Sequence, residues 1–97
     1  MATLGIDISK ADFHVELSVN EKLRHRRFVN RKEGFKELCV WLARNKAESV
    51  HACLEATGRY GDELALHLYQ AGYVVSERDL ENKIASTLSR LQARGRA

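Results

Sequence analysis

The chain has 97 residues, of which 44% are hydrophobic and 30% are charged, and its formal net charge is +3. This length allows one small domain with a modest core, and the mild positive charge permits a nucleic-acid partner without demanding one. No apolar run approaches the roughly 20 residues of a membrane span, and no signal-peptide pattern opens the chain, so we expect a cytoplasmic protein without membrane contact. Cys39 and Cys53 have no ligand-type neighbours in sequence, and we expect them to be reduced core residues.

The first thirty residues predict a meander of three strands. Apolar and polar side chains alternate over residues 4–8 and 13–19, a pattern typical of strands with one wet face. Residues 23–29 follow as a third predicted strand. Asn20-Glu21 is a hairpin-type break between the second and third strands. Because the connections are short, the three strands should be antiparallel.

The remainder of the chain alternates between helices and strands. Helical spacing predicts a helix over residues 32–46, a second over residues 60–71 that Gly72 ends, and a third from residue 80 onward. Residues 50–54 and 73–76 have strand patterns, and the helical crossovers make these strands parallel to the first. Ser76 and Asp79 are spaced for a capping box before the last helix. The order strand–strand–strand–helix–strand–helix–strand–helix is the one that an α/β, ribonuclease H-like fold with a five-stranded mixed sheet requires.

Two carboxylates follow apolar strand patterns and precede small polar turns. Asp7 lies in Gly5-Ile6-Asp7-Ile8-Ser9-Lys10, and Glu55 lies in Leu54-Glu55-Ala56-Thr57-Gly58. A cation held by such acids activates water and shields the charge of a phosphate, as phosphoryl-transfer nucleases require. On spacing alone, the two acids fit equally well as residues that end strands and cap turns.

These two motifs carry a resemblance to a known family. Together with Phe13-His14-Val15, Asn30-Arg31-Lys32-Glu33-Gly34-Phe35 and Trp41-Leu42, they cover roughly residues 4 to 75. Over this range the chain resembles the RuvC-like DEDD transposases of IS110-type insertion sequences and the related Piv-type DNA invertases.

The resemblance implies a RuvC-like fold in which Asp7 and Glu55 lie on neighbouring strands as catalytic, metal-binding acids. It implies Mg²⁺ or Mn²⁺ as cofactor, DNA as substrate, strand cleavage and transfer as the reaction, and a structured guide RNA in the full-length family. Residues of the loops at the site would be Ser9, Thr57, Gly58 and Tyr60.

The chain departs from the family pattern after residue 76. Val74-Val75 runs into Ser76-Glu77 where the family has Val-Asn-Pro, and a second pair of aspartates is missing. We therefore expect residues 1–97 to be a single RuvC-like N-terminal domain, truncated relative to a full-length transposase and inactive alone. Whether this chain is itself an enzyme stays open.

Basic residues gather in the third predicted strand and the turn after it. Those that we expect to contact a nucleic-acid backbone are Lys10, Arg24, Arg26, Arg27, Arg31 and Lys32. On an edge strand such residues also discourage edge-to-edge aggregation. The last predicted helix has an apolar stripe of Leu80, Ile84, Leu88 and Leu91, which should pack on a sheet or another domain and which favours a homo-oligomer.

Two other functions compete with the transposase interpretation. A non-catalytic remnant would bind nucleic acid or a partner through its basic face alone. An actin-like nucleotide-binding domain also opens with Gly-Ile-Asp, but it needs Gly-Thr after the acid to cradle phosphate. This chain has Ile8-Ser9-Lys10 there.

Overall fold

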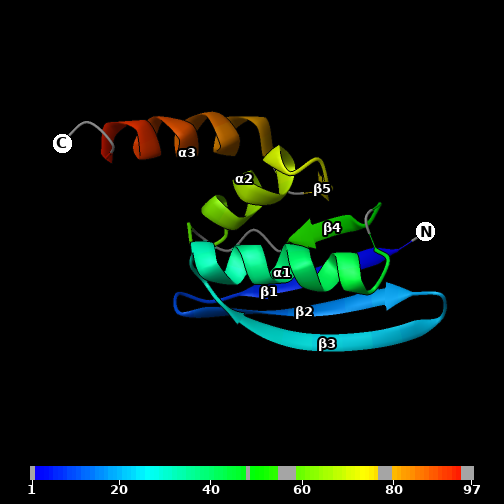
Figure 1. Ribbon diagram of the computed structural model, residues 1–97. Helices are drawn as coiled ribbons and strands as arrows, with labels where there is room; N and C mark the ends of the chain where they lie inside the picture. The colour runs from blue at the N-terminus through cyan, green and yellow to red at the C-terminus, as the bar shows by residue number, and fades with distance from the viewer. Residues whose placement is uncertain (1, 48, 55–58, 77–79, 95–97) are drawn as a thin grey trace.

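The computed structural model describes residues 2–47, 49–54, 59–76 and 80–94. The elements follow one another in the predicted order, as Figure 1 shows. They are β1 (Thr3–Ile8), β2 (Asp12–Val19), β3 (Lys22–Val29), α1 (Lys32–Arg44), β4 (His51–Leu54), α2 (Asp62–Gln70), β5 (Val74–Ser76) and α3 (Leu80–Arg94).

The strands form one mixed sheet. It has five strands in the order β3-β2-β1-β4-β5, with β1 at the centre. β1 pairs antiparallel with β2, and β2 with β3, whereas β4 is parallel to both β1 and β5. The α/β class and the mixed sheet predicted for a ribonuclease H-like fold are confirmed.

Backbone conformation explains where the elements end. Asn20 and Glu21 adopt φ values of 51° and 64°, as the two central residues of a tight hairpin turn require. Gly72, at φ 93°, follows α2 in the left-handed conformation that the sequence predicts. Helix α1 ends at Arg44 rather than at the expected residue 46, because Lys46 has a φ of 56° that no helix accommodates.

The core fills the space between one face of the sheet and the helices α1 and α2. Alternate residues of β1 and β2, such as Leu4 and Phe13, are buried there, and Leu38 of α1 and Leu68 of α2 are fully buried against them. The Phe13 ring stacks on Phe28 of β3 with centroids 5.4 Å apart. In Figure 1 the three helices all lie on this side of the sheet.

Among the described residues, helix α3 packs mainly on α2 (Figure 1). Its contact is partly polar: Thr87 is buried, and Arg90 donates to a carboxylate oxygen of Asp62 at 2.9 Å. Arg94 pairs with Glu63 at the next turn. The apolar stripe expected on this helix is only half covered, since Ile84, Leu88 and Leu91 are all of intermediate exposure. No helix in the described part of the chain is long and apolar enough to cross a membrane.

No helix of the described part of the chain covers the opposite face of the sheet, which we call the bare face (Figure 1). Side chains that alternate with the core residues are exposed on it: Thr3, Asp7, His14, Glu16, His25, Arg27 and Cys53. The expectation that both cysteines are core residues is therefore wrong for Cys53, because it occupies the uncovered side of β4. Cys39 is partly covered on α1, and burial raises the pKa of its thiol.

Candidate metal and nucleic-acid site

The candidate site begins where two parallel strands end side by side. Ile6 of β1 pairs with Leu54 of β4, and the two strands run in the same direction. Asp7 follows Ile6 on β1. Glu55 follows Leu54 in the sequence and lies outside the described residues, as do Thr57 and Gly58.

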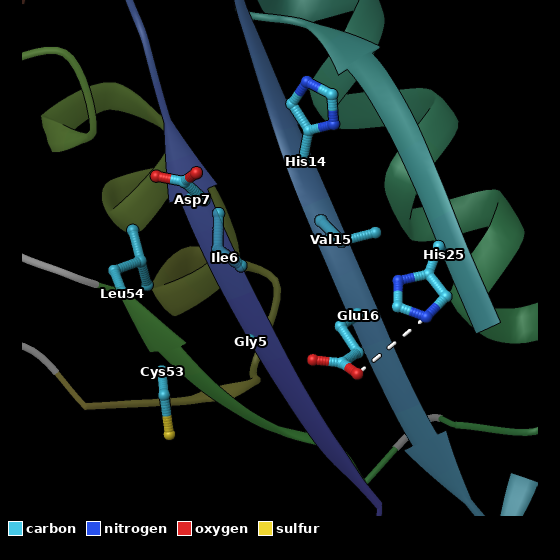
Figure 2. Close-up of a pocket in the computed structure, with 9 residues that line it drawn as sticks. All are labelled: Gly5, Ile6, Asp7, His14, Val15, Glu16, His25, Cys53 and Leu54. Atoms are coloured by element: carbon cyan, nitrogen blue, oxygen red, sulfur yellow. Dashed lines mark ion pairs between the residues drawn. The ribbon is translucent and has the colours of Figure 1, made fainter. Parts of the chain in front are cut away.

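The side chain of Asp7 projects outward from the bare face of the sheet. Its strand partner on β2 is His14, and Figure 2 shows the two side chains on the same side of the strands. They line a shallow depression of about 510 Å³ that also includes Gly5, Glu16 and Cys53. Asp7 is exposed and has no hydrogen-bond or ion-pair partner among the described residues. Its carboxylate oxygens are therefore available to an external ligand.

Other acids on this face already have partners. A carboxylate oxygen of Glu16 lies 3.9 Å from Nε2 of His25, the contact drawn as a dashed line in Figure 2. Asp12 lies 3.5 Å from a guanidinium nitrogen of Arg27 and 4.0 Å from His14 Nε2. Within the described ranges, no group of three or more potential metal-ligating side chains comes together. Asp7 is thus set apart by its lack of a counter-charge.

The turn after Asp7 is closed by Ser9 and Asp12. The Ser9 amide donates to the Asp12 carbonyl at 2.9 Å, and the Ser9 hydroxyl lies 2.8 Å from a carboxylate oxygen of Asp12. The hydroxyl of Ser9 is therefore used to hold the turn. Lys10 is exposed at the tip of the same turn, where its ammonium is free to approach an anion.

Asn30 connects the two halves of the site. Its side-chain amide donates to the Ser9 carbonyl at 3.0 Å and to the Tyr60 carbonyl at 2.8 Å. Its backbone amide donates to the Ala11 carbonyl at 2.9 Å. One residue thereby ties the turn beyond Asp7 to the segment that leads into α2. Sequence reasoning noted Asn30 only as part of the family pattern, and its position between a strand and a helix was the available signal.

Gly61 brings the start of α2 against the ends of β1 and β4. A Cβ atom at this position would lie 2.5 Å from Cδ1 of Ile8 and 3.6 Å from Cδ2 of Leu54. The absence of a side chain therefore permits the helix to approach β1, which contains Asp7, and β4, which precedes Glu55 in the sequence. Tyr60, which we expected at the edge of the site, is exposed, and its carbonyl accepts the bond from Asn30.

The structure distributes the predicted basic residues over separate surfaces. Arg27 lies on the bare face beside Asp12, whereas Arg26 lies over the Phe28 ring on the α1 side of the sheet. Arg24 lines a depression beside the end of α1, and Lys32 lines another between α1, α2 and α3. Arg31 is exposed at the N-terminus of α1. These residues therefore do not form one continuous patch.

The fold and the candidate site define a ribonuclease H-like domain whose central strand carries, near its end, a carboxylate with no partner among the described residues. A family model described as a transposase, of the IS110-type DEDD class, matches residues 4–96. The chain belongs to this transposase family, as its resemblance indicated. Membership supports a DNA transposase-type function in transposition and DNA recombination, and suggests the use of a divalent metal. A search of curated proteins gives no match.

Proposed function

We propose that this chain is the catalytic-type, RuvC-like N-terminal domain of a DNA transposase or recombinase. Asp7 and Glu55 would be its metal-binding acids. The observation that carries this proposal is the parallel pairing of Ile6 with Leu54. Asp7 and Glu55 are the residues that follow this pair in the sequence, so we expect both acids at the same edge of the sheet. The bridge made by Asn30 supports the same arrangement.

The donor chemistry suits a hard divalent cation such as Mg²⁺ or Mn²⁺. Carboxylate oxygens are the ligands that these ions prefer, and the Asp7 carboxylate is exposed and has no described partner. When bound, such a cation supplies charge stabilisation and an activated oxygen nucleophile for phosphoryl transfer. Two carboxylates hold one ion weakly, so we expect a low affinity.

The chain's own residues would orient a DNA backbone at this edge. Lys10 extends from the turn beyond Asp7, so its ammonium can neutralise a phosphate that lies there. Asn30 keeps that turn fixed relative to Tyr60, which is needed if Asp7 and Glu55 are to act on one phosphate. Asp7 is exposed and lines an open depression of about 510 Å³ on this face, which supports the placement of a DNA strand next to it.

We infer that this chain alone does not cut DNA at a measurable rate. Phosphoryl transfer with two cations needs more acidic ligands than Asp7 and Glu55 supply. Among the described residues of the bare face, Asp12 is paired with Arg27 and Glu16 lies beside His25. Residues 1–97 would then be one part of a longer enzyme that contributes the remaining acids.

The test is incubation with branched and linear DNA in Mg²⁺ and in Mn²⁺. We expect no cleavage by the chain alone. Cleavage that disappears in the Asp7→Asn variant would show a complete nuclease and contradict our account of the missing acids. Cleavage that copurifies with the chain and persists in this variant would contradict the assignment of Asp7.

A non-catalytic function in nucleic-acid binding is the alternative. It is favoured by the lack of a cluster of three metal-ligating side chains among the described residues. It predicts DNA binding that Mg²⁺ only weakens, as added salt does, and a response to Mg²⁺ that the Asp7→Asn change leaves the same. The transposase proposal predicts instead that Mg²⁺ strengthens DNA binding and that the change removes this effect.

We also propose that the full-length protein works as a homo-oligomer and binds a guide RNA as well as DNA. The half-covered stripe on α3 supports self-association, because Ile84, Leu88 and Leu91 retain apolar surface that a second copy would cover. Light scattering should show a species larger than a monomer, and Leu88→Glu should reduce its size. A monomer at high concentration, or an oligomer that survives Leu88→Glu, would contradict this contact.

A further inference from the structure

A second basic surface lies on the side of β3 that faces away from Asp7. Side chains alternate along this edge strand, so Lys22, Arg24 and Arg26 lie on the α1 side, together with Phe28. Arg27 lies on the opposite, bare side. The basic run of the sequence is therefore split between two faces of the sheet.

Helix α1 and the turn after it add cations to this surface. Lys36 and Arg44 line a depression of about 290 Å³ together with Arg26 and Trp41. Lys22, Arg24, Arg44 and Lys46 line a second depression of about 340 Å³. Because Arg44 lines both, the two depressions adjoin and form one surface, which we call the β3–α1 groove.

The charges of the groove are unbalanced. Its six cations are Lys22, Arg24, Arg26, Lys36, Arg44 and Lys46. Among the described residues that line it, Glu37 is the one acid. None of the six cations forms an ion pair with a described residue. A polyanion is the partner that such a surface complements.

The arrangement of the cations fits a nucleic-acid backbone better than a folded acidic protein. Alternate residues of a strand are about 7 Å apart, a spacing comparable to that of successive phosphates along one nucleic-acid strand. Arg26 is further oriented by the Phe28 ring, whose centroid lies 4.9 Å from its guanidinium carbon. Phe28 in turn packs against Trp41 of α1 with centroids 5.9 Å apart. The row of cations is thus supported by the core.

We propose that the β3–α1 groove binds the phosphate backbone of a second nucleic-acid segment, distinct from the DNA at Asp7. The two surfaces lie on opposite sides of the sheet, so one stretch of backbone cannot contact both without passing around the edge strand. The choice of a nucleic acid as the partner rests on the proposed function. Binding by the groove, however, requires neither Asp7 nor a metal ion. It offers phosphate contacts and no base readout, so binding should be independent of sequence.

The test measures binding of two labelled probes, a mixed-sequence DNA duplex and a single strand of RNA, in EDTA over a range of salt concentrations. The triple variant Arg24→Gln/Arg26→Gln/Arg44→Gln should lose about tenfold or more in affinity at low salt for the probe that occupies the groove. The slope of log K against log salt should become shallower by about 2 to 3, since each lost phosphate contact removes just under one unit. All three residues are exposed, so the variant should keep the melting temperature of the parent.

A matched control tests whether the loss of binding is specific to the groove. Arg94→Gln removes an exposed cation of α3 that lies outside the groove. This control should reduce affinity by less than about twofold in EDTA. Unchanged binding of both probes by the triple variant would overturn the proposal and leave the cations as protection of an edge strand. Equal losses in the Arg26→Gln and Arg94→Gln variants would also overturn it.

If the Asp7 assignment is wrong, the triple variant still loses binding in EDTA. If the groove is wrong, Asp7→Asn still changes the response to Mg²⁺. The two failures are therefore distinguishable.

Discussion

The two faces of the sheet divide stability and chemistry between them. On the covered face, alternate residues such as Phe13 and Leu4 are fully buried beneath α1 and α2. On the bare face, the neighbouring residues His14 and Asp7 are exposed (Figure 2). One strand thus contributes to a dry core and to an open polar surface, because its side chains point alternately to opposite sides.

This difference shows how a small chain can carry a charged site at little cost in stability. An unpaired carboxylate is expensive in an apolar interior but inexpensive in water. Asp7 is exposed although its neighbours Ile6 and Ile8 contribute to the core side. Substitutions should therefore have large effects on folding on one face and small effects on the other.

The largest effect should come from Phe13→Ala. The Phe13 ring is fully buried and contacts the rings of Phe28 and Phe35, so its removal should lower the free energy of unfolding by about 3–5 kcal/mol. The matched control is His14→Ala, one residue along β2 on the bare face, which should change stability by less than about 0.5 kcal/mol. Urea unfolding measures both. Equal losses would mean that the bare face is covered in solution.

The ion pair between Arg90 and Asp62 should come next. Asp62 is 9% exposed and has one carboxylate oxygen without a partner among the described residues. Arg90→Ala would leave this acid without its counter-charge, at a cost of about 1–3 kcal/mol. Arg94→Ala removes a more exposed pair with Glu63 and should cost less than about 1 kcal/mol. Equal melting temperatures for the Arg90→Ala and Arg94→Ala variants would show that Asp62 does not anchor α3.

Asn30→Ala tests the connection between the two halves of the candidate site. Two side-chain hydrogen bonds would be lost, to the carbonyls of Ser9 and Tyr60, at about 1–2 kcal/mol in total because both are solvent-exposed. Asn30→Asp is the sharper variant, since it keeps the shape but loses the donors. Divalent-metal affinity should fall in both variants. Normal metal binding despite the lost stability would show that Asn30 does not position the acids.

The smallest effect should be the dependence of folding stability on pH that comes from His67, on the covered side of the sheet. Burial, assisted by the charges of Lys36 and Lys32, lowers the pKa of His67 on α2 below its ordinary value of 6.5. The unfolded chain therefore binds this proton more tightly than the folded chain, and stability should fall as the pH drops through that ordinary value toward the lower folded pKa. His67→Gln should make this loss shallower. An unchanged pH profile in the variant would exclude His67 as its cause.

The fold was predictable because local and global signals agree in this chain. Alternation over β2, where Phe13, Val15 and Leu17 are all buried, gave the correct strand and its inner face. Asn20-Glu21 and Gly72 marked turns whose positive φ values the structure bears out. The predicted end of α1 was less accurate. The polar residues after Arg44 continue the helical pattern of the sequence, and nothing in that pattern indicates the left-handed conformation of Lys46.

The candidate site was predictable only in part. Asp7 could be found because a carboxylate interrupts an apolar strand, and the structure places it on the open face. The role of Asn30 could not be predicted, since its partners Ser9 and Tyr60 are backbone carbonyls distant in sequence. The separation of Arg26 from Arg27 follows from strand alternation, but the contribution of Arg44 to the same groove depends on how α1 packs. The roles of Asp7 and Glu55 in metal binding remain predictions.

The most direct measurement of the central claim is an NMR titration with Mn²⁺, which broadens the signals of nuclei near its binding site. We predict that the amides of Ile6, Ile8 and Leu54 broaden first, that Asp7→Asn and Glu55→Gln each abolish this broadening, and that Glu16→Gln leaves it intact. Glu16 is the matched control because it is an exposed carboxylate on the same face that lies beside His25 and away from the ends of β1 and β4. Broadening that persists unchanged in Asp7→Asn, or that centres on a different acid, would contradict a metal site shared by Asp7 and Glu55.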